Sequence, residues 1–399
     1  MTQSFFVSQK MLQFMERSSW IRKMFEEGIR LKNIHGKDKV FDFSLGNPDL
    51  PPPDAFEQTL ARIAANPQPG AHAYMPNAGL DSVKERVAAR VAEDHDVPVT
   101  KNEIIMTCGA AGGLNIIFKA ILNEGEEVIT PAPYFVEYGF YVDNHGGKLV
   151  PVPANPDFSL NLSAIEAAIT PKTKAVLINS PHNPTGAVYS RNAIKDLIEI
   201  LKNASQSTGQ TIFLISDEPY RRLAFDGLRV PALLDLYENA IITTSFSKDL
   251  SIPGERIGYV AVNPVCPCKT QLLGAMTLAN RILGFVNAPA LMQRVVAEVL
   301  NESVDVGIYQ RRRDRFASIL DEAGYEFTMP KGAFYFFPKT PIDDVKFVSM
   351  LQEELILAVP GTGFGCPNHM RLAFCVDEAV IEGARAGFKR AMERAKETP

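Results

Sequence analysis

The chain has 399 residues, of which 46% are hydrophobic and 22% charged, which is typical of a globular protein with one large and one smaller domain. Its 41 lysines and arginines and 46 aspartates and glutamates give a net charge of −5, which argues against nucleic acid or an anionic membrane as the main partner. One dense basic stretch falls in a helical pattern and is interpreted as a solvent-exposed helix face: Arg311, Arg312, Arg313 and Arg315.

The five cysteines indicate a reducing compartment, because their count is odd and their spacing gives no disulfide framework. Cys266 and Cys268 lie too close together for a usual zinc site, and no Cys/His pair completes one, so we expect no metal. The first twenty residues lack the basic and then apolar regions of a signal peptide, and no apolar run reaches membrane-spanning length. We therefore expect a cytoplasmic protein without a membrane partner.

In chain order, the pattern predicts an amphipathic helix over residues 8–35, a short strand at Val40–Ser44 and a proline-rich loop at Asn47–Pro53. From about 55 to 280, apolar strands alternate with helical stretches. The expected strands are Glu103–Thr107, Glu127–Thr130, Ala175–Asn179, Thr211–Ser216, Ala240–Ser245 and Ile257–Val262. Several are apolar on both faces, which predicts a mostly parallel sheet covered by helices.

The last part of the chain predicts a helical segment over 288–322, short strands at Ala333–Phe337 and Met370–Phe374, and a final helix at Glu378–Lys396. The expected fold class is therefore α/β. A three-layer large domain would span residues 48–287, and a smaller α+β domain would be built from both chain ends, 1–47 and 288–399.

One lysine stands out, because Ser245-Phe246-Ser247-Lys248 follows an apolar run and Arg256 comes eight residues later. Open α/β sheets hold their ligands at the carboxyl ends of strands, where this lysine is expected. The hydroxyls and the guanidinium offer an anion three or more donors. An amine beside a phosphate-sized anion site suggests a Schiff base to pyridoxal phosphate.

The same S-x-x-K spacing also occurs in penicillin-binding serine hydrolases, which need S-D-N and K-T-G elsewhere. This chain has Ser216-Asp217-Glu218 and residues 360–363 as P-G-T-G instead. Neither fits, so the hydrolase hypothesis is set aside.

A second strand end is rich in small residues, Cys108-Gly109-Ala110-Ala111-Gly112-Gly113, and runs into a helix. Such a turn lets backbone N–H groups approach a phosphate, although plain helix–sheet packing is an equal alternative. The dinucleotide spacing G-x-G-x-x-G is absent.

A third strand ends in Asn179 and leads to Asn183-Pro184-Thr185-Gly186, which offers the Asn183 amide at its tip but also reads as an ordinary Asn-Pro turn. His182 beside it has no acidic partner in sequence and is interpreted as a loop histidine.

A fourth strand is closed by a carboxylate, Asp217, with a phenol three residues on at Tyr220. A buried charge is costly unless it is paired, and a protonated pyridine nitrogen would supply that partner and make the ring an electron sink. Tyr220 could bind the 3-oxygen of such a ring. The alternative is a surface loop after a strand.

Taken in order, these motifs resemble the fold-type I pyridoxal-phosphate aminotransferases of class I/II, of the aspartate aminotransferase kind. The match runs from Gly46 to Arg371. It comprises Y-x-P-x-x-G, the glycine-rich turn, N-P-T-G, S-D-E-x-Y, S-x-S-K and R-x-G-Y.

The resemblance implies that Lys248 forms the internal aldimine and moves the substrate proton, and that Asp217 pairs with the pyridinium. Asn183 and Tyr220 would hold the 3-oxygen, and Tyr134 would stack on the ring. The phosphate would be bound by Ser245, Arg256 and the turn at Gly109, Ala110 and Ala111. Two departures are Pro219, where an aliphatic residue is usual, and the alanine pair, which leaves only backbone donors.

For the substrate, the resemblance implies that Arg371 clamps the α-carboxylate, with contacts from Asn183 and the Gly46 backbone. Tyr74 would reach the phosphate of a neighbouring subunit, which implies a homodimer with shared sites. We also expect the pKa of Lys248 to be lowered by Arg256 and by imine formation.

The implied reaction is a ping-pong transamination from an L-amino acid to a 2-oxo acid such as 2-oxoglutarate. The alternatives are a carbon–sulfur β-lyase on the same scaffold and a non-enzymatic regulator. The amino-acid donor stays open. Arg281 is a candidate for a side-chain carboxylate or a helix-surface arginine, and Phe334 and Tyr335 are candidates for a substrate pocket or for core packing.

Overall fold

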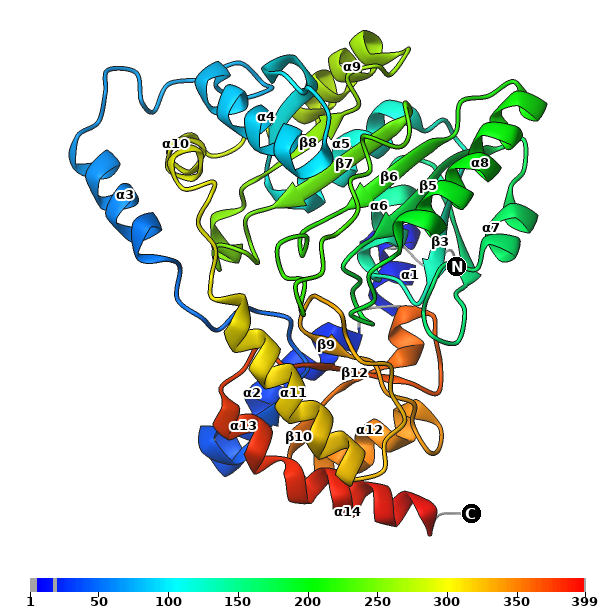
Figure 1. Ribbon diagram of the computed structural model, residues 1–399. Helices are drawn as coiled ribbons and strands as arrows, with labels where there is room; N and C mark the ends of the chain where they lie inside the picture. Colours follow the sequence, from blue (N-terminus) through cyan, green and yellow to red (C-terminus); the bar gives the residue numbers. More distant parts are fainter. Residues whose placement is uncertain (1–5, 17–19, 398–399) are drawn as a thin grey trace.

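The computed structural model describes residues 6–16 and 20–397. Figure 1 shows an upper part built around a large sheet and a lower part to which both ends of the chain contribute. This is the predicted α/β architecture with a second, smaller part.

The large sheet has seven strands in the order β2-β8-β7-β6-β5-β3-β4, and every neighbouring pair is parallel except the two made by β8. The strands are β2 (Ile104–Thr107), β3 (Glu127–Ala132), β4 (Lys148–Pro153), β5 (Thr173–Asn179), β6 (Phe213–Asp217), β7 (Ala240–Ser245) and β8 (Gly258–Val262). The six predicted strands are confirmed within a few residues. The sequence missed β4, because this edge strand is largely exposed and carries two prolines in place of an apolar run.

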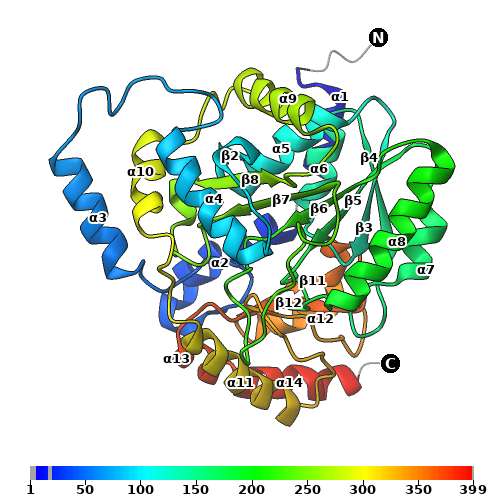
Figure 2. The ribbon, with the colours of Figure 1, turned by 45° about the horizontal axis from the view of Figure 1, so that its top comes forward.

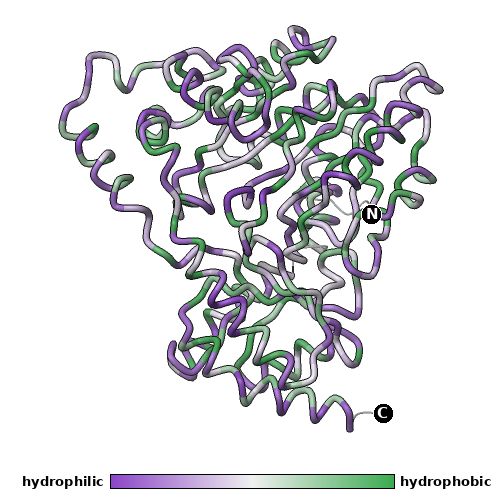
Figure 3. Tube along the Cα trace, viewed as in Figure 1, coloured by the Kyte–Doolittle hydropathy of each residue, from purple (hydrophilic) through white to green (hydrophobic). Residues whose placement is uncertain are grey.

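Helices cover both faces of this sheet, which makes the three layers (Figure 2). Alternate strand residues face opposite sides, so Ile104 and Met106 join one core cluster and Ile105 joins the other. The first face carries α3 (Asp54–Ala65), α4 (Asp81–His95), α7 (Leu162–Ala168), α8 (Arg191–Thr208) and α10 (Ala290–Glu298). The second carries α5 (Gly109–Ile121), α6 (Glu137–Asp143) and α9 (Lys269–Ile282). The strands form the hydrophobic centre of the trace in Figure 3.

The lower part encloses a core of its own, dominated by phenylalanines. Its small sheets are β1 (Phe41–Asp42) with β10 (Ile356–Leu357), and β11 (Val359–Pro360), β12 (Met370–Ala373) and β9 (Tyr335–Phe336). Its helices are α2 (Trp20–His35), α11 (Val306–Glu322), α12 (Asp344–Glu353), α13 (Glu378–Gly383) and α14 (Arg385–Lys396). The described residues also form short 3₁₀ helices: η1 (Lys37–Lys39), η2 (Lys101–Glu103), η3 (Pro253–Glu255) and η4 (Gly361–Phe364).

Two predicted helices are divided in the structure, and a third is described in two pieces. That third prediction, 8–35, corresponds to α1 (Gln9–Glu16) and α2, and residues 17–19 between them lie outside the described residues. Helix α1 packs on α6 through Phe14 and Phe140, whose ring centroids are 4.9 Å apart. The segment 288–322 becomes α10 and α11, with Asp305 capping the start of α11. The last helix divides after Gly383, where a Cβ would lie 2.4 Å from the Phe41 ring. Helical periodicity continues across such breaks, so the sequence did not reveal them.

The position of α10 bears on the domain division. Its buried residues Met292, Val295 and Val296 belong to the core of the upper part. On this packing we propose that the large domain extends through α10, beyond the expected boundary at residue 287.

The interpretation of the basic stretch as an exposed face is wrong for two of its members. Arg312 and Arg313 are buried, because carboxylates from distant segments neutralise them. Arg312 pairs with Asp49 at 2.7 Å and Arg313 with Asp226 at 2.6 Å.

No helix among residues 6–16 and 20–397 is long and apolar enough to cross a membrane. Nor do three or more of their His, Cys, Asp and Glu side chains gather as a group able to hold a metal ion.

Candidate active site

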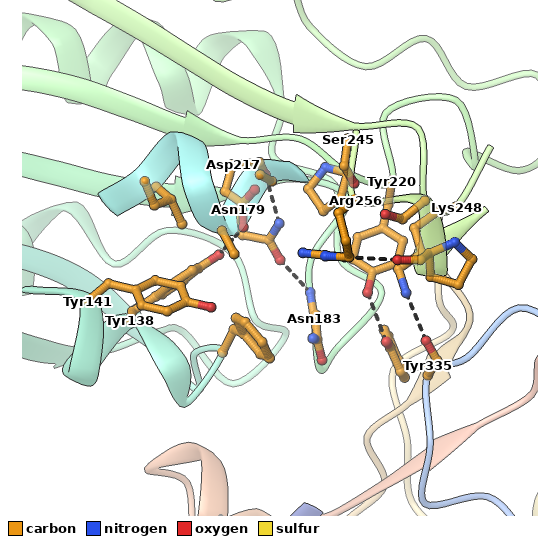
Figure 4. Close-up of a pocket in the computed structure, with 18 of the residues that line it drawn as sticks. Tyr138, Tyr141, Asn179, Asn183, Asp217, Tyr220, Ser245, Lys248, Arg256 and Tyr335 are labelled. Atoms are coloured by element: carbon orange, nitrogen blue, oxygen red, sulfur yellow. Dashed lines mark hydrogen bonds between the residues drawn. The ribbon is translucent and has the colours of Figure 1, made fainter. Parts of the chain in front are cut away.

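A cavity of about 320 Å³ lies where the carboxyl ends of the central strands face the lower part of the molecule (Figure 4). It brings together most of the residues that the sequence singled out: Gly46, Ala110, Ala111, Asn183, Asp217, Tyr220, Ser245, Lys248, Arg256 and Arg371. Parallel strands end at one edge of the sheet, which is why residues so far apart in sequence meet there.

The turn from β2 into α5 forms one wall. Gly109 has φ +71, a left-handed conformation that glycine adopts without strain. A Cβ at Gly109 would lie 3.0 Å from Nη2 of Arg256, so the glycine also lets that guanidinium approach the turn. Ala110 and Ala111 follow in the first turn of α5, where backbone N–H groups have no partner within the helix. The wall therefore combines a cation with free amide donors, which suits a phosphate.

Lys248 is the central amine of the cavity. Its Nζ donates to the carbonyl of Gly46 at 2.9 Å. The pKa of Lys248 is lowered to about 8, mainly by burial; Cys375 opposes this lowering, and the charges of Arg371 and Arg256 contribute to it. The expected lowering is present, but desolvation is its main cause, not Arg256.

Asp217 is the buried acid of the cavity. Tyr138 donates to its Oδ2 at 2.7 Å, whereas its Oδ1 is buried and has no hydrogen-bond partner among the described residues. Burial raises the pKa of Asp217 to about 7, the Tyr138 hydrogen bond opposes this, and the Glu218 carboxylate adds to it. An orphaned carboxylate oxygen in a cavity points to a cationic donor on a ligand.

Asn183 is held through its backbone N–H and through its side-chain oxygen. Its N–H donates to Oδ1 of Asn179 at 2.6 Å, and Asn179 donates in turn to the carbonyl of Asp217 at 2.7 Å (Figure 4). The Asn183 side-chain oxygen accepts from Nη1 of Arg371 at 3.1 Å. The loop is thus tied to both the acid and the arginine.

Arg371 lies fully within the protein. Its Nη2 donates to the carbonyl of Ser44 at 2.7 Å, and its guanidinium carbon lies 4.7 Å from the ring centroid of Tyr335 and 4.9 Å from that of Phe364. Burial lowers the pKa of Arg371, and no residue in the described part of the chain hydrogen-bonds to its Nε. A carboxylate would supply the missing counter-charge.

Tyr220 and Tyr335 hydrogen-bond through their hydroxyls at 2.8 Å. Burial raises the pKa of Tyr220 well above its usual value, so the phenol stays protonated. Of the two candidates for a substrate pocket, Tyr335 lines the cavity, whereas Phe334 is packed in the core.

The structure places Tyr134 outside this cavity, contrary to its predicted position on the ring. Its side chain lines a second cavity beside Phe14 and Phe140, and its N–H donates to the carbonyl of Phe364 at 3.1 Å. The next residue, Phe135, lines the main cavity instead. Neighbouring side chains point in different directions, so the sequence could not show which of these two adjacent aromatic residues faces the cavity.

Sequence reasoning also missed other lining residues, among them Leu114, Tyr138, Tyr141, Asn179 and Ser247. The tyrosines recur at i and i+3 on α6, and this spacing on one helix face was the only available signal.

Three further candidates lie outside the cavity lining. Tyr74 is 93% exposed, and Arg281 is exposed on α9. His182 is buried in its loop with Nδ1 2.8 Å from Oγ1 of Thr185, and burial lowers its pKa to about 3. It is therefore a neutral structural histidine, as interpreted.

Residues 38–387 match the family model described as aminotransferase class I and II. The chain belongs to this family. The aminotransferase is 33% identical over 371 residues to a probable aspartate/prephenate aminotransferase of Aquifex aeolicus, with 89% of this chain and 91% of the relative covered. It is 31% identical over 377 residues to the aspartate aminotransferase of Bacillus subtilis (strain 168), with 89% and 92% covered.

Solved structures agree with this assignment. An aminotransferase from Eubacterium rectale superposes with a TM-score of 0.95 at 37% identity and covers 98% of this chain and 99% of its own. The aspartate aminotransferase of Thermus thermophilus with maleate superposes with a TM-score of 0.84 at 28% identity, with 94% and 97% covered. This aminotransferase is therefore an enzyme that transfers amino groups, and the β-lyase alternative is not favoured.

The family depends on pyridoxal phosphate, and the residues of this aminotransferase fit that cofactor. An amine, an orphaned carboxylate oxygen and a turn of free amides beside a guanidinium line one cavity. These are the groups that an aldehyde, a ring nitrogen and a phosphate require.

Proposed function

We propose that this aminotransferase holds pyridoxal phosphate on Lys248 and moves an amino group from an L-amino acid to a 2-oxo acid. The observation that supports this most directly is the unpartnered Oδ1 of Asp217 in the same cavity as a lysine of lowered pKa. When bound, the cofactor supplies an aldehyde for amino groups and a ring that accepts electrons.

The chain's own residues would act around that ring. Asp217 would accept a hydrogen bond from the ring nitrogen and keep it protonated. Asn183 and Tyr220 would donate to the 3-oxygen. The phosphate would be held by Ser245, Arg256 and the amides of Ala110 and Ala111, at the turn that begins with Gly109.

Lys248 and Arg371 would act on the substrate, Lys248 by proton transfer and Arg371 by binding its α-carboxylate. With a pKa of about 8, a fraction of the Lys248 amine is neutral near pH 7 and can take the proton from the substrate Cα. Arg371 would bind the α-carboxylate, supported by Asn183 and by the backbone at Gly46. Phe135 lines the cavity and would be the aromatic residue that faces the ring, the role that the resemblance implied for Tyr134.

The substrate class follows from the relatives' names and from the charges of the cavity. The relatives are named for aspartate and prephenate, so we propose a dicarboxylic donor such as L-aspartate, with 2-oxoglutarate as acceptor. Among the described lining residues the cations are Lys248, Arg256 and Arg371, and each is already assigned. A second carboxylate would therefore be met by a residue from outside this lining, for which Arg281 of a neighbouring subunit is our candidate.

We further propose a cytoplasmic homodimer. Apolar side chains are exposed at i and i+4 on two helices, Phe25 and Ile29 on α2 and Leu278 and Ile282 on α9, and such surfaces commonly mark interfaces. Tyr74 is 93% exposed and does not line the cavity of its own chain, and it would reach the phosphate in the partner's.

The attachment of the cofactor is tested by Lys248→Ala. Wild-type protein reduced with borohydride in the presence of pyridoxal phosphate should carry the cofactor on the peptide that contains Lys248, as read by mass spectrometry. The variant should carry none there and lose activity on the order of 10³-fold or more. Lys195→Ala, an exposed lysine on α8, is the matched control. A labelled Lys195 peptide with an unlabelled Lys248 would contradict the proposal.

The substrate class is tested by a panel of aspartate, alanine, methionine and phenylalanine, each with 2-oxoglutarate as acceptor. We expect aspartate to give the highest kcat/KM and the initial rates to follow the ping-pong pattern. A strong preference for phenylalanine would shift the class to aromatic amino acids. Pyruvate and ammonia from cysteine-type substrates without an acceptor would restore the lyase alternative.

A further inference from the structure

Two catalytic candidates are each followed in sequence by a buried carboxylate: Asp217 by Glu218, and Lys248 by Asp249. Neither Glu218 nor Asp249 lines the cavity of the active site. Both line a smaller polar cavity of about 30 Å³, which shares Pro219 and Ser245 with the active site. The two acids therefore lie behind the wall that carries Asp217 and Lys248.

These acids belong to a group of charged side chains that we call the rear cluster: Arg90, Asp94, His95, Glu218, Arg221, Arg222 and Asp249. Three carboxylates face three guanidiniums. None of these residues is needed for the transfer of an amino group as described above.

Glu218 is held from two sides. Nη1 of Arg221 donates to its Oε2 at 3.1 Å, and Nε2 of His95 lies 3.4 Å from the same oxygen. Because Nδ1 of His95 accepts from the backbone N–H of Leu233 at 3.2 Å, the His95 proton sits on Nε2 and is donated to Glu218. Arg221 also donates to the carbonyl of Asp94 at 2.6 Å, which ties the segment after β6 to the end of α4.

Asp249, at the other catalytic segment, is held by a longer ion pair and by hydrogen bonds of the backbone, one of them from the N–H of Leu250 to its Oδ1 at 3.0 Å. Its Oδ2 lies 3.7 Å from Nη1 of Arg222, and its carbonyl accepts from the N–H of Val304 at 2.8 Å. Arg222 donates to three successive carbonyls, at 3.0 Å to Leu300, 3.0 Å to Asn301 and 2.6 Å to Glu302. Lys248 is thereby tied to the junction where the chain passes from α10 to α11.

Buried ion pairs are a poor means of gaining stability, because apolar residues of similar volume often do as well. What such pairs do supply is fixed direction, since a charged partner accepts few geometries. We propose that the rear cluster is a positioning device: it fixes Asp217 and Lys248 relative to one another so that both address the same cofactor. Glu218 and Arg221 hold the acid's segment, and Asp249 and Arg222 hold the lysine's.

This inference rests on the proposed function, and the test keeps the two apart. Glu218→Gln and Asp249→Asn keep the size of each side chain but remove its charge. We expect each to raise the Kd of the apoprotein for pyridoxal phosphate about tenfold or more and to lower kcat by a similar factor, because displacements of ~1 Å are enough for such losses. The KM for the amino donor should change less than about twofold, since Arg371 is untouched.

The matched control is Glu382→Gln, which breaks ion pairs with Arg315 and Arg385 on the exposed face of α13. It should leave Kd and kcat unchanged. Arg221→Lys should lose less affinity than Arg221→Met, because it keeps the charge that faces Glu218. If Glu218→Gln does not fold, Asp249→Asn decides the matter, since its 3.7 Å pair is looser.

The proposal would be overturned if the rear-cluster variants kept the Kd and kcat of the wild type and lost only unfolding temperature. The cluster would then contribute stability alone. A wild-type protein that binds no pyridoxal phosphate would instead overturn the proposed function.

Discussion

At the scale of single residues, the candidate active site buries an acid and an amine, and burial disfavours the charged form of each. Asp217 is buried with one oxygen unpartnered, and Lys248 is buried against a carbonyl. Burial raises the pKa of the acid to about 7 and lowers that of the amine to about 8. Without a ligand, each group is ready to receive a partner that relieves this cost.

Removing the Asp217 carboxylate should make the apoprotein more stable. The folded-state pKa of Asp217 is raised to about 7 from 3.8, so its ionisation lowers the free energy of unfolding progressively between about pH 4 and pH 7, and the full loss is present above pH 7. Asp217→Asn should therefore stabilise the apoprotein at pH 8 by on the order of 2–4 kcal/mol, and the gain should vanish below pH 4. Urea unfolding at both pH values measures this.

The control for that measurement is Asp196→Asn, an exposed carboxylate on α8, which should change stability by less than about 0.5 kcal/mol. The Asp217→Asn protein should also bind pyridoxal phosphate more weakly. Equal stability of wild type and Asp217→Asn at pH 8 would mean that the acid is not strained in the apoprotein.

At the scale of elements, the close approach of α5 to the sheet sets the position of the turn at Gly109, Ala110 and Ala111, which is the proposed phosphate site. A Cβ on Gly113 would lie 2.1 Å from Oγ1 of Thr243 and 3.0 Å from Cγ2 of Val260. The helix can therefore lie against β7 and β8 only because residue 113 has no side chain. The same contact fixes where the first turn of α5 presents its amides.

Two glycine-to-alanine changes separate packing from helix propensity. Gly113→Ala should destabilise the protein by about 1–3 kcal/mol through overpacking and weaken cofactor binding, because α5 must move. Gly139→Ala on α6 meets only Cδ2 of Leu149, at an ordinary contact distance of 4.0 Å, and should be neutral or stabilise by up to about 1 kcal/mol, since alanine is the better helix former. Thermal unfolding and cofactor titration measure both. Equal effects of the two changes would rule out the packing argument.

At the scale of the whole molecule, the cavity depends on the lower part being folded onto the upper. Arg371 on β12 donates to Asn183 of the upper part and to Ser44, 327 residues earlier in the chain. A single chain, however, leaves Tyr74 pointing into solvent. This supports the proposal that a complete site needs two chains.

Mixing two impaired variants tests the sharing of sites. Lys248→Ala and Tyr74→Ala should each be weak alone, but a mixed dimer has one site with both native residues. Random exchange of subunits should restore on the order of a quarter of wild-type activity. Refolding the two together and assaying the mixture measures this, with each variant refolded alone as control. No recovery in a mixture that light scattering shows to be dimeric would contradict the shared site.

The amino-acid order was enough to predict the motifs at the strand ends, with their lysine, acid and arginine, and six of the seven strands of the large sheet. A side chain brings its chemistry with it, and strand periodicity is a local signal. Folding was needed to show that Phe135 and not Tyr134 lines the cavity, that Tyr138 donates to one oxygen of Asp217, and that Arg312 and Arg313 are buried. Each of those outcomes is set by contacts between segments far apart in the chain, and spacing along one sequence carries no measure of such contacts.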